Sequence, residues 1–204
     1  MTFLAEAQIE TRATELWRAH SLTPGFDVER LLDELELSLV WESLDDEAGA
    51  DVLGQLVPAR SLVVLNERHI DRLEARQGRL RRFTIGHEIA HWMLHADAVR
   101  SGTLSLFDGE RIWCRTGSTD PIERQAEMFS AALLIPRNLL RDALAPTPAP
   151  WSGWPVVYRL ADRFLVNVTP MAIRLERLGW MHRDERGSPV SGPASAPGQG
   201  VLFN

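Results

Sequence analysis

Hydrophobic residues recur at helical spacing in several stretches of the chain, and proline or glycine borders most of them. Asp27 can cap the helix that follows it, and Asp120 (or the threonine before it) can cap another with Pro121 in its first turn. The last helical stretch begins at Pro170 and stops before Gly179. The predicted helices cover residues 2–20, 28–36, 80–95, 120–133, 136–144, 156–164 and 170–178.

Alternating or β-branched runs predict three strands, at residues 37–41, 52–57 and 61–66. We expect them to form a small antiparallel sheet. A later run, TLSLFDGERIWCR, alternates on both sides of Asp108 and Gly109 and predicts a hairpin or a loop with strand character. A small sheet combined with several helices places the chain in the α+β class.

The 204 residues, of which 45% are hydrophobic, suit one compact domain, or one such domain and a small appendage. We expect a core at residues 1–144, a proline-rich connector at 145–155 and a helical pair at 156–181 packed on the core. Residues 182–204 are rich in Gly, Ser, Pro and Ala and predict a disordered tail. No apolar run could span a bilayer, no signal peptide is evident, and the single cysteine excludes an internal disulfide. A cytoplasmic location is the resulting expectation.

The helix predicted from residue 80 carries His87, Glu88 and His91 in the pattern H-E-x-x-H. Helix residues four apart share a face with Cβ atoms about 5–6 Å apart, so both imidazoles can bind one zinc ion. Glu88 is turned about 100° away, outside the ligand set but close enough to take a proton from zinc-bound water. The remaining helix positions are largely apolar, which favours a buried catalytic zinc. A structural zinc site is the alternative, although four Cys or His ligands usually close such sites.

A catalytic zinc needs a third protein ligand. His95 lies about 12 Å from His87 along a straight helix, too far to share the ion, and is interpreted as a helix-terminal residue. Glu123, on the next predicted helix, is the better candidate, and Glu127 one turn later could orient a ligand histidine. A capping box between Asp120 and Glu123 is the alternative.

The segments RRFTIGHEIAHWMLH and IERQAEMFSAALLIP together resemble the ImmA/IrrE family of bacterial zinc metallopeptidases. In that family an F-T-x-x-H-E-x-x-H helix precedes E-x-x-A-N-x-F-A-A-x-L-L-M-P. DVERLLDELEL, SLVVLNE and LADRFLVNVTPMAIRLERLG extend the resemblance over about 175 residues. It implies that His87, His91 and Glu123 bind Zn²⁺, that Glu88 is the general base, and that the sheet packs on a thermolysin-like zinc helix core with C-terminal helices. The family's Asn falls at Glu127.

Cys114 is the only cysteine and lies between the two ligand-bearing segments. Thiolate is a strong zinc ligand, so Cys114 could occupy the fourth position and hold the enzyme inactive, as in a cysteine switch. The alternative is a buried cysteine that packs as a small hydrophobic residue.

All 22 basic residues are arginines, although the net charge is −6. Seven of them fall between residues 60 and 82, and the simpler explanations are a compositional bias and a solvated charged face. Guanidinium groups also bind phosphate, which suggests single-stranded or damaged DNA as an activator. The candidate nucleic-acid-binding residues are Arg68, Arg72, Arg76, Arg79, Arg81 and Arg82.

The resemblance implies a zinc endopeptidase that cuts a helix-turn-helix repressor and so derepresses mobile-element, DNA-damage or phage-defence genes. An alternative from another class is a non-catalytic zinc-containing sensor that binds repressor or DNA without cleavage. The helix pair in LADRFLVNVTPMAIRLERLG, which has the look of a helix-turn-helix, keeps that alternative open.

Overall fold

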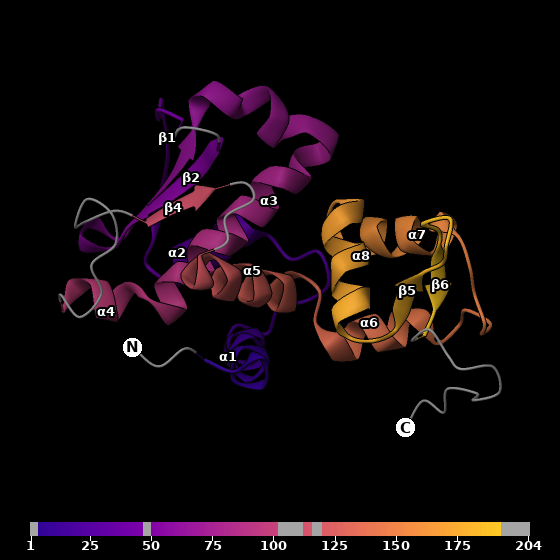
Figure 1. Ribbon diagram of the computed structural model, residues 1–204. Helices are drawn as coiled ribbons and strands as arrows, with labels where there is room; N and C mark the ends of the chain where they lie inside the picture. Colours follow the sequence, from indigo (N-terminus) through magenta and orange to yellow (C-terminus); the bar gives the residue numbers. More distant parts are fainter. Residues whose placement is uncertain (1–3, 47–49, 102–111, 116–119, 193–204) are drawn as a thin grey trace. The chain divides into compact units, whose positions relative to one another are not determined.

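The computed structural model describes residues 4–46, 50–101, 112–115 and 120–192, with the backbone alone at 99–100 and 112–115 (Figure 1). It divides into two compact units, Met1–Leu134 and Ile135–Asn204. The boundary therefore precedes the helix expected at 136–144, which packs against the next helix of the second unit. No helix in the described ranges is both long and apolar enough to cross a membrane.

Helices are present where the sequence predicted them in the first unit, but the helical residues before the break in α3, helix α4 and two 3-10 helices were not predicted. Asp27 caps α2 as expected, because its carboxylate accepts hydrogen bonds from the backbone N–H groups of Glu29 and Arg30. The elements are α1 (Glu6–Ala19), α2 (Val28–Glu34), η1 (Pro58–Arg60), η2 (Glu67–His69), α3 (Ile70–Leu94), α4 (Ala96–Arg100) and α5 (Pro121–Leu134).

A break divides α3 before the H-E-x-x-H motif. Arg76, Gln77 and Gly78 have positive φ angles, which no α-helix tolerates. The helix that carries the motif therefore starts after Gly78, as the glycine in the sequence predicts.

The sheet of the first unit contains β1 (Ser38–Glu42), β2 (Val52–Val57), β3 (Leu62–Asn66) and β4 (Ile112–Arg115) in the order β1-β3-β2-β4. The α+β class is confirmed, but the expectation of a wholly antiparallel sheet was wrong, because β1 runs parallel to β3. β3 lies between β1 and β2 in the sheet, parallel to β1 and antiparallel to β2. Alternation of hydrophobic and polar residues predicts a strand but not its direction relative to its neighbours, so the sequence could not show that β1 and β3 are parallel. The turn expected at Asp108 and Gly109 lies outside the described residues.

Glycines let β2 and α5 approach α3 closely (Figure 1). A Cβ atom at Gly54 in β2 would lie 2.8 Å from Thr84 Cγ2 and 3.3 Å from Glu88 Oε1. A Cβ atom at Gly86 in α3 would lie 2.9 Å from Ser130 Oγ of α5. All three distances are shorter than ordinary van der Waals contact, so Gly54 and Gly86 set the spacing of the elements around the motif.

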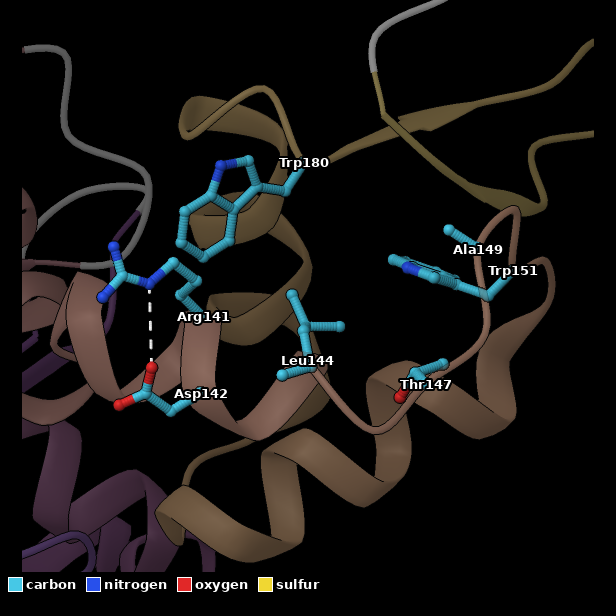
Figure 2. Close-up of a pocket in the computed structure, with 8 residues that line it drawn as sticks. Arg141, Asp142, Leu144, Thr147, Ala149, Trp151 and Trp180 are labelled. Carbon is cyan, nitrogen blue, oxygen red and sulfur yellow. Dashed lines mark ion pairs between the residues drawn. The ribbon is translucent and has the colours of Figure 1, made fainter. Parts of the chain in front are cut away.

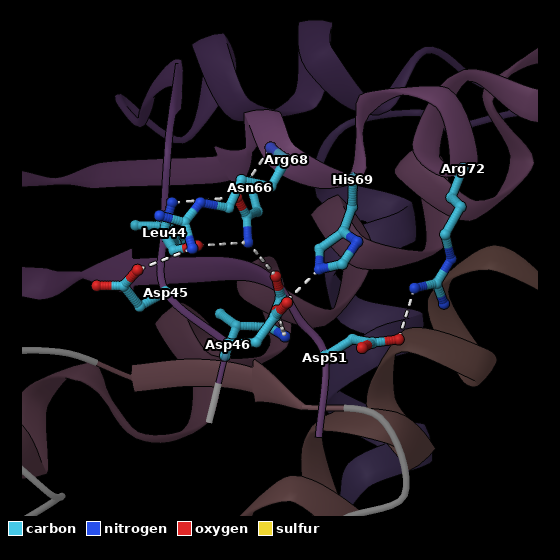
Figure 3. Close-up of polar contacts among 9 residues, drawn as sticks. Leu44, Asp45, Asp46, Asp51, Asn66, Arg68, His69 and Arg72 are labelled. Atoms are coloured by element: carbon cyan, nitrogen blue, oxygen red, sulfur yellow. Dashed lines mark hydrogen bonds and ion pairs between the residues drawn. The ribbon is translucent and has the colours of Figure 1, made fainter. Parts of the chain in front are cut away.

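Asn66 ties the β1–β2 connection to β3 (Figure 3). Its amide nitrogen donates to the carbonyl oxygens of Leu44 at 3.1 Å and Val52 at 2.7 Å. Its amide oxygen accepts from the backbone N–H groups of Leu44 at 3.0 Å and Arg68 at 3.1 Å. The side chain is fully buried, so all of these bonds are shielded from water.

Ion pairs join the same connection to the start of α3 (Figure 3). His69 Nε2 lies 2.8 Å from Asp46 Oδ1, and Arg72 pairs with Asp51 at 2.5 Å. One ligand atom from each of Asp46, Asp51 and His69 lies within 4.8 Å of the others. Because protein partners already satisfy these carboxylates, we interpret the cluster as stabilising the fold rather than as a metal site.

The second unit contains α6 (Arg137–Leu144), α7 (Trp154–Phe164), α8 (Val168–Arg177), β5 (Met181–Arg183) and β6 (Pro189–Ser191). β5 and β6 form an antiparallel hairpin, so the expectation of disorder from residue 182 was wrong up to Gly192. Asp184 stabilises the turn, because its carboxylate accepts from the N–H groups of Arg186 and Ser188, and Gly187 adopts a positive φ. The Gly- and Ser-rich composition concealed this turn.

Candidate metal centre

The two histidines of the motif and Glu123 converge in the interior of the first unit. His87 Nε2 lies 3.0 Å from Glu123 Oε2, and His91 Nε2 lies 3.3 Å from Glu123 Oε1. The two histidine nitrogens are 2.9 Å apart. All three residues are at least 93% buried, with exposed fractions of 2%, 0% and 7% for His87, His91 and Glu123. Three side chains from two helices therefore point ligand atoms at one place.

The spacing of these atoms fits a zinc ion. Ligand atoms about 2.0–2.1 Å from a tetrahedral zinc are about 3.3 Å from one another. The two histidine nitrogens are 2.9 Å apart, and each has one Glu123 oxygen at a comparable distance, Oε2 at 3.0 Å from His87 and Oε1 at 3.3 Å from His91. Two imidazoles and one carboxylate also leave the fourth position of a tetrahedron for water. The residues present thus fit a catalytic rather than a closed structural site.

Glu88 lies beside this triad without serving as a ligand. It is fully buried, and within the described structure neither of its carboxylate oxygens has a hydrogen-bond partner. Burial, and next the negative charge of Glu123, raise the pKa of Glu88 well above its usual range. A buried carboxylate of high basicity, with free lone pairs, is suited to accept a proton from water.

The charges of the ligand residues suit metal binding. Burial acts to raise the pKa of Glu123, but hydrogen bonds from His87 and His91 outweigh it and lower the pKa. Burial lowers the pKa of His91, although the hydrogen bond with Glu123 opposes the effect. An ionised carboxylate beside a neutral imidazole is the protonation state that a metal ion requires.

The start of α5 places Glu123. Asp120 accepts a hydrogen bond from the backbone N–H of Ile122 at 2.8 Å, which caps the helix as expected. Both oxygens of Glu123 face the histidines, so the alternative of a capping box with Asp120 is wrong. Gly86 and Ser130 bring α5 against α3. The third ligand therefore depends on helix packing, not on the motif itself.

His95 has a role that the sequence did not reveal. Its Nδ1 lies 3.0 Å from Nδ1 of His91, on the opposite side of the His91 ring from Glu123. Burial, and then the charge of His91, lower the pKa of His95 to about 3, so its ring is neutral. If His91 donates Nδ1–H to His95, its Nε2 keeps a lone pair for the metal. The distance between His87 and His95 along the helix excluded His95 as a zinc ligand. His95 is, however, four residues after His91, and this helical spacing could have indicated the contact between the two rings.

The family model described as Peptidase_M78, IrrE N-terminal-like domain, matches residues 63–176. This is more than half of the 204 residues and includes the whole triad. The chain belongs to this family. No curated protein matches the sequence. The expected resemblance to ImmA/IrrE peptidases is confirmed, and the Peptidase_M78 assignment supports a metallopeptidase.

Two further candidate residues are Glu127 and Cys114. Glu127 is half-buried one turn after Glu123, and in the described part of the chain no hydrogen bond joins it to either ligand histidine. The backbone of Cys114 lies in β4, opposite Gly54 of β2. The position of its sulfur lies outside the described structure, so the cysteine switch stays a prediction.

The arginines do not form one exposed cationic face. Arg82 is buried, donates to the Phe26 carbonyl oxygen and lies 4.8 Å from the centre of the Phe26 ring. Burial lowers its pKa to about 10. Arg81 pairs with Glu29 and Glu74 at 2.9 and 3.3 Å. Arg68 and Arg72 pair with aspartates, Arg79 is half-buried, and Arg76 is exposed in the break of α3.

Proposed function

We propose that this chain is a zinc-dependent endopeptidase whose substrate is a helix-turn-helix transcriptional repressor. Cleavage would derepress a stress, mobile-element or phage-defence operon. The convergence of His87, His91 and Glu123 beside the unpartnered carboxylate of Glu88 is the observation that carries the enzymatic part. The Peptidase_M78 assignment supports the reaction class. The choice of repressor as substrate rests on the resemblance to the ImmA/IrrE family.

Each residue has a distinct task in this reaction. His87, His91 and Glu123 would hold the ion, which supplies a Lewis acid that polarises the scissile carbonyl and acidifies the attacking water. Glu88 accepts the proton of that water and afterwards gives it to the departing amine nitrogen. His95 keeps the His91 ring oriented through the contact between their Nδ1 atoms. The burial of Glu88 limits the contact of its carboxylate with bulk water.

The test is incubation of the purified zinc-loaded protein with a helix-turn-helix repressor encoded next to its gene. We expect two repressor fragments, separated by electrophoresis and located by mass spectrometry. Glu88→Gln is the matched control, because it keeps the ligand set and removes the base; it should lower the rate about 10²- to 10⁴-fold. Repressor that is bound but never cut would favour the non-catalytic sensor instead.

A cysteine switch is the proposed restraint. Cys114 pairs in register with Gly54, and a Cβ atom at Gly54 would lie only 3.3 Å from Glu88 Oε1, so the backbone of β4 is one strand away from the site. Cys114→Ala should then raise cleavage in the absence of any trigger, whereas Cys114→Ser should give an intermediate effect because a hydroxyl is a poorer zinc ligand. Equal activity of all three proteins at full zinc occupancy would exclude the switch.

Single-stranded DNA is the proposed trigger, with Arg76, exposed at the break of α3, as one contact residue. Arg76→Ser should reduce the slope of log affinity against log salt by about 0.7, the contribution of one phosphate contact. Arg82→Met should leave that slope unchanged, because Arg82 is buried against Phe26. Absence of oligonucleotide binding at low salt would end this part of the proposal.

A further inference from the structure

The second unit contains a cavity of about 350 Å³ that the peptidase site does not use (Figure 2). Its walls include Leu144 and the rings of Trp151 and Trp180, which lie on two sides of that leucine (Figure 2). Arg141 and Asp142, at one end, pair with each other at 3.6 Å. Apart from Thr147, the other lining side chains are apolar, so the cavity suits an uncharged hydrophobic side chain rather than an ion.

The described chain leaves this unit beside the two tryptophans. Ser191 donates its backbone N–H to the Trp151 carbonyl oxygen at 2.9 Å, and its hydroxyl accepts from the Trp151 N–H at 3.0 Å. Gly192 donates to the Trp180 carbonyl oxygen at 2.7 Å. Residues 193–204 therefore start from a point that is hydrogen-bonded to both walls of the cavity.

Residues 193–204, PASAPGQGVLFN, combine a linker with a hydrophobic group. Residues 193–200 are small or polar, and Val201, Leu202 and Phe203 follow directly. Eight residues can span at most about 26–29 Å when fully extended. The segment carries no ionisable side chain, which matches the apolar walls.

We propose that the triplet Val201–Phe203 of this same chain docks in the cavity between Trp151 and Trp180. Tethering favours this occupant, because a short flexible linker gives an effective concentration on the order of millimolar. Suppose that a free peptide of this sequence binds the cavity with a Kd of about 0.1 mM. The same residues, tethered within the chain, would then give a ratio of occupied to empty cavity of about ten to one. The inference does not depend on peptidase activity.

Fluorine NMR of full-length protein labelled with 5-fluorotryptophan tests the proposal. The chain has seven tryptophans, and the variants Trp151→Phe and Trp180→Phe identify the two resonances of the cavity. Replacing Val201, Leu202 and Phe203 together by serine should shift these two resonances and leave the others in place. The matched control, Ala194→Ser with Ala196→Ser, changes the linker alone and should shift neither.

A second measurement uses the triple serine variant as the receptor. The synthetic peptide GQGVLFN should return both resonances to their wild-type positions with a Kd between about 0.1 and 1 mM, whereas GQGSSSN should have no effect. Identical Trp151 and Trp180 resonances in wild type and triple variant would overturn the proposal. So would wild-type shifts that depend on protein concentration together with a dimer in light scattering, because the occupant would then come from a second copy.

Discussion

Gly86 offers a direct test of the link between helix packing and the metal centre. A Cβ atom at this position would lie 2.9 Å from Ser130 Oγ and 3.3 Å from Leu134 Cδ1, both on α5. Gly86→Ala should therefore push α5 away from α3, and with it Glu123, whose oxygens lie 3.0 and 3.3 Å from His87 and His91. One methyl group is thus expected to weaken a metal site that it does not touch.

Two opposing effects set the change in the free energy of unfolding that Gly86→Ala should cause. Replacing a helical glycine by alanine gains about 1 kcal/mol of helix propensity. Overpacking of a close contact costs about 1–3 kcal/mol. The net loss in the free energy of unfolding is therefore about 0–2 kcal/mol, or a fall in Tm of up to roughly 8 °C for a chain of this size. Ser130→Ala removes the nearest clashing atom, the hydroxyl oxygen. This substitution should itself cost little stability, because the hydroxyl makes only a long hydrogen bond of 3.4 Å to the Phe83 carbonyl oxygen.

A double-mutant cycle with these two substitutions separates the terms. In the Ser130→Ala background, Gly86→Ala should be neutral or stabilising by up to about 1 kcal/mol, which gives a coupling energy of about 1–2 kcal/mol. Urea unfolding measures the free energies, and competition with a fluorescent chelator measures zinc affinity. Strictly additive effects, or unchanged zinc affinity in a destabilised Gly86→Ala protein, would refute the reasoning.

Three further substitutions examine the centre directly. Glu123→Ala removes one of three ligands, so zinc affinity should fall more than about 100-fold, beyond what loss of an outer hydrogen-bond partner usually costs; near-stoichiometric zinc by mass spectrometry after dialysis would contradict the assignment. His95→Ala should weaken zinc binding about 10- to 100-fold by freeing the His91 ring, and an unchanged affinity would mean that their contact is only packing. Gly54→Ala places a methyl group 2.8 Å from Thr84 Cγ2 and should lower the free energy of unfolding, measured in urea, by about 1–3 kcal/mol. An unfolding midpoint equal to that of the wild type would show that β2 can move away from α3.

Local patterns were sufficient for most of the helices, and for two of the three candidate metal ligands together with the base. His87, Glu88 and His91 belong to one helix, whose period alone puts two ligands on one face and the base beside them. The cap at Asp27 and the break at Gly78 are equally local, because each depends on the residues next to it. The parallel pairing of β1 with β3 was missed because strand direction depends on the path of the whole connection.

What the sequence by itself determined is therefore the chemistry of one helix: two imidazoles, a base and a buried apolar setting. Tertiary structure alone decided that Glu123 is within 3.0–3.3 Å of both histidines rather than in a capping box. It also decided that Arg82 is buried against Phe26 rather than available to phosphate. The physical reason is that these outcomes depend on the distance between packed elements, which Gly54 and Gly86 set through contacts with residues far away in the chain.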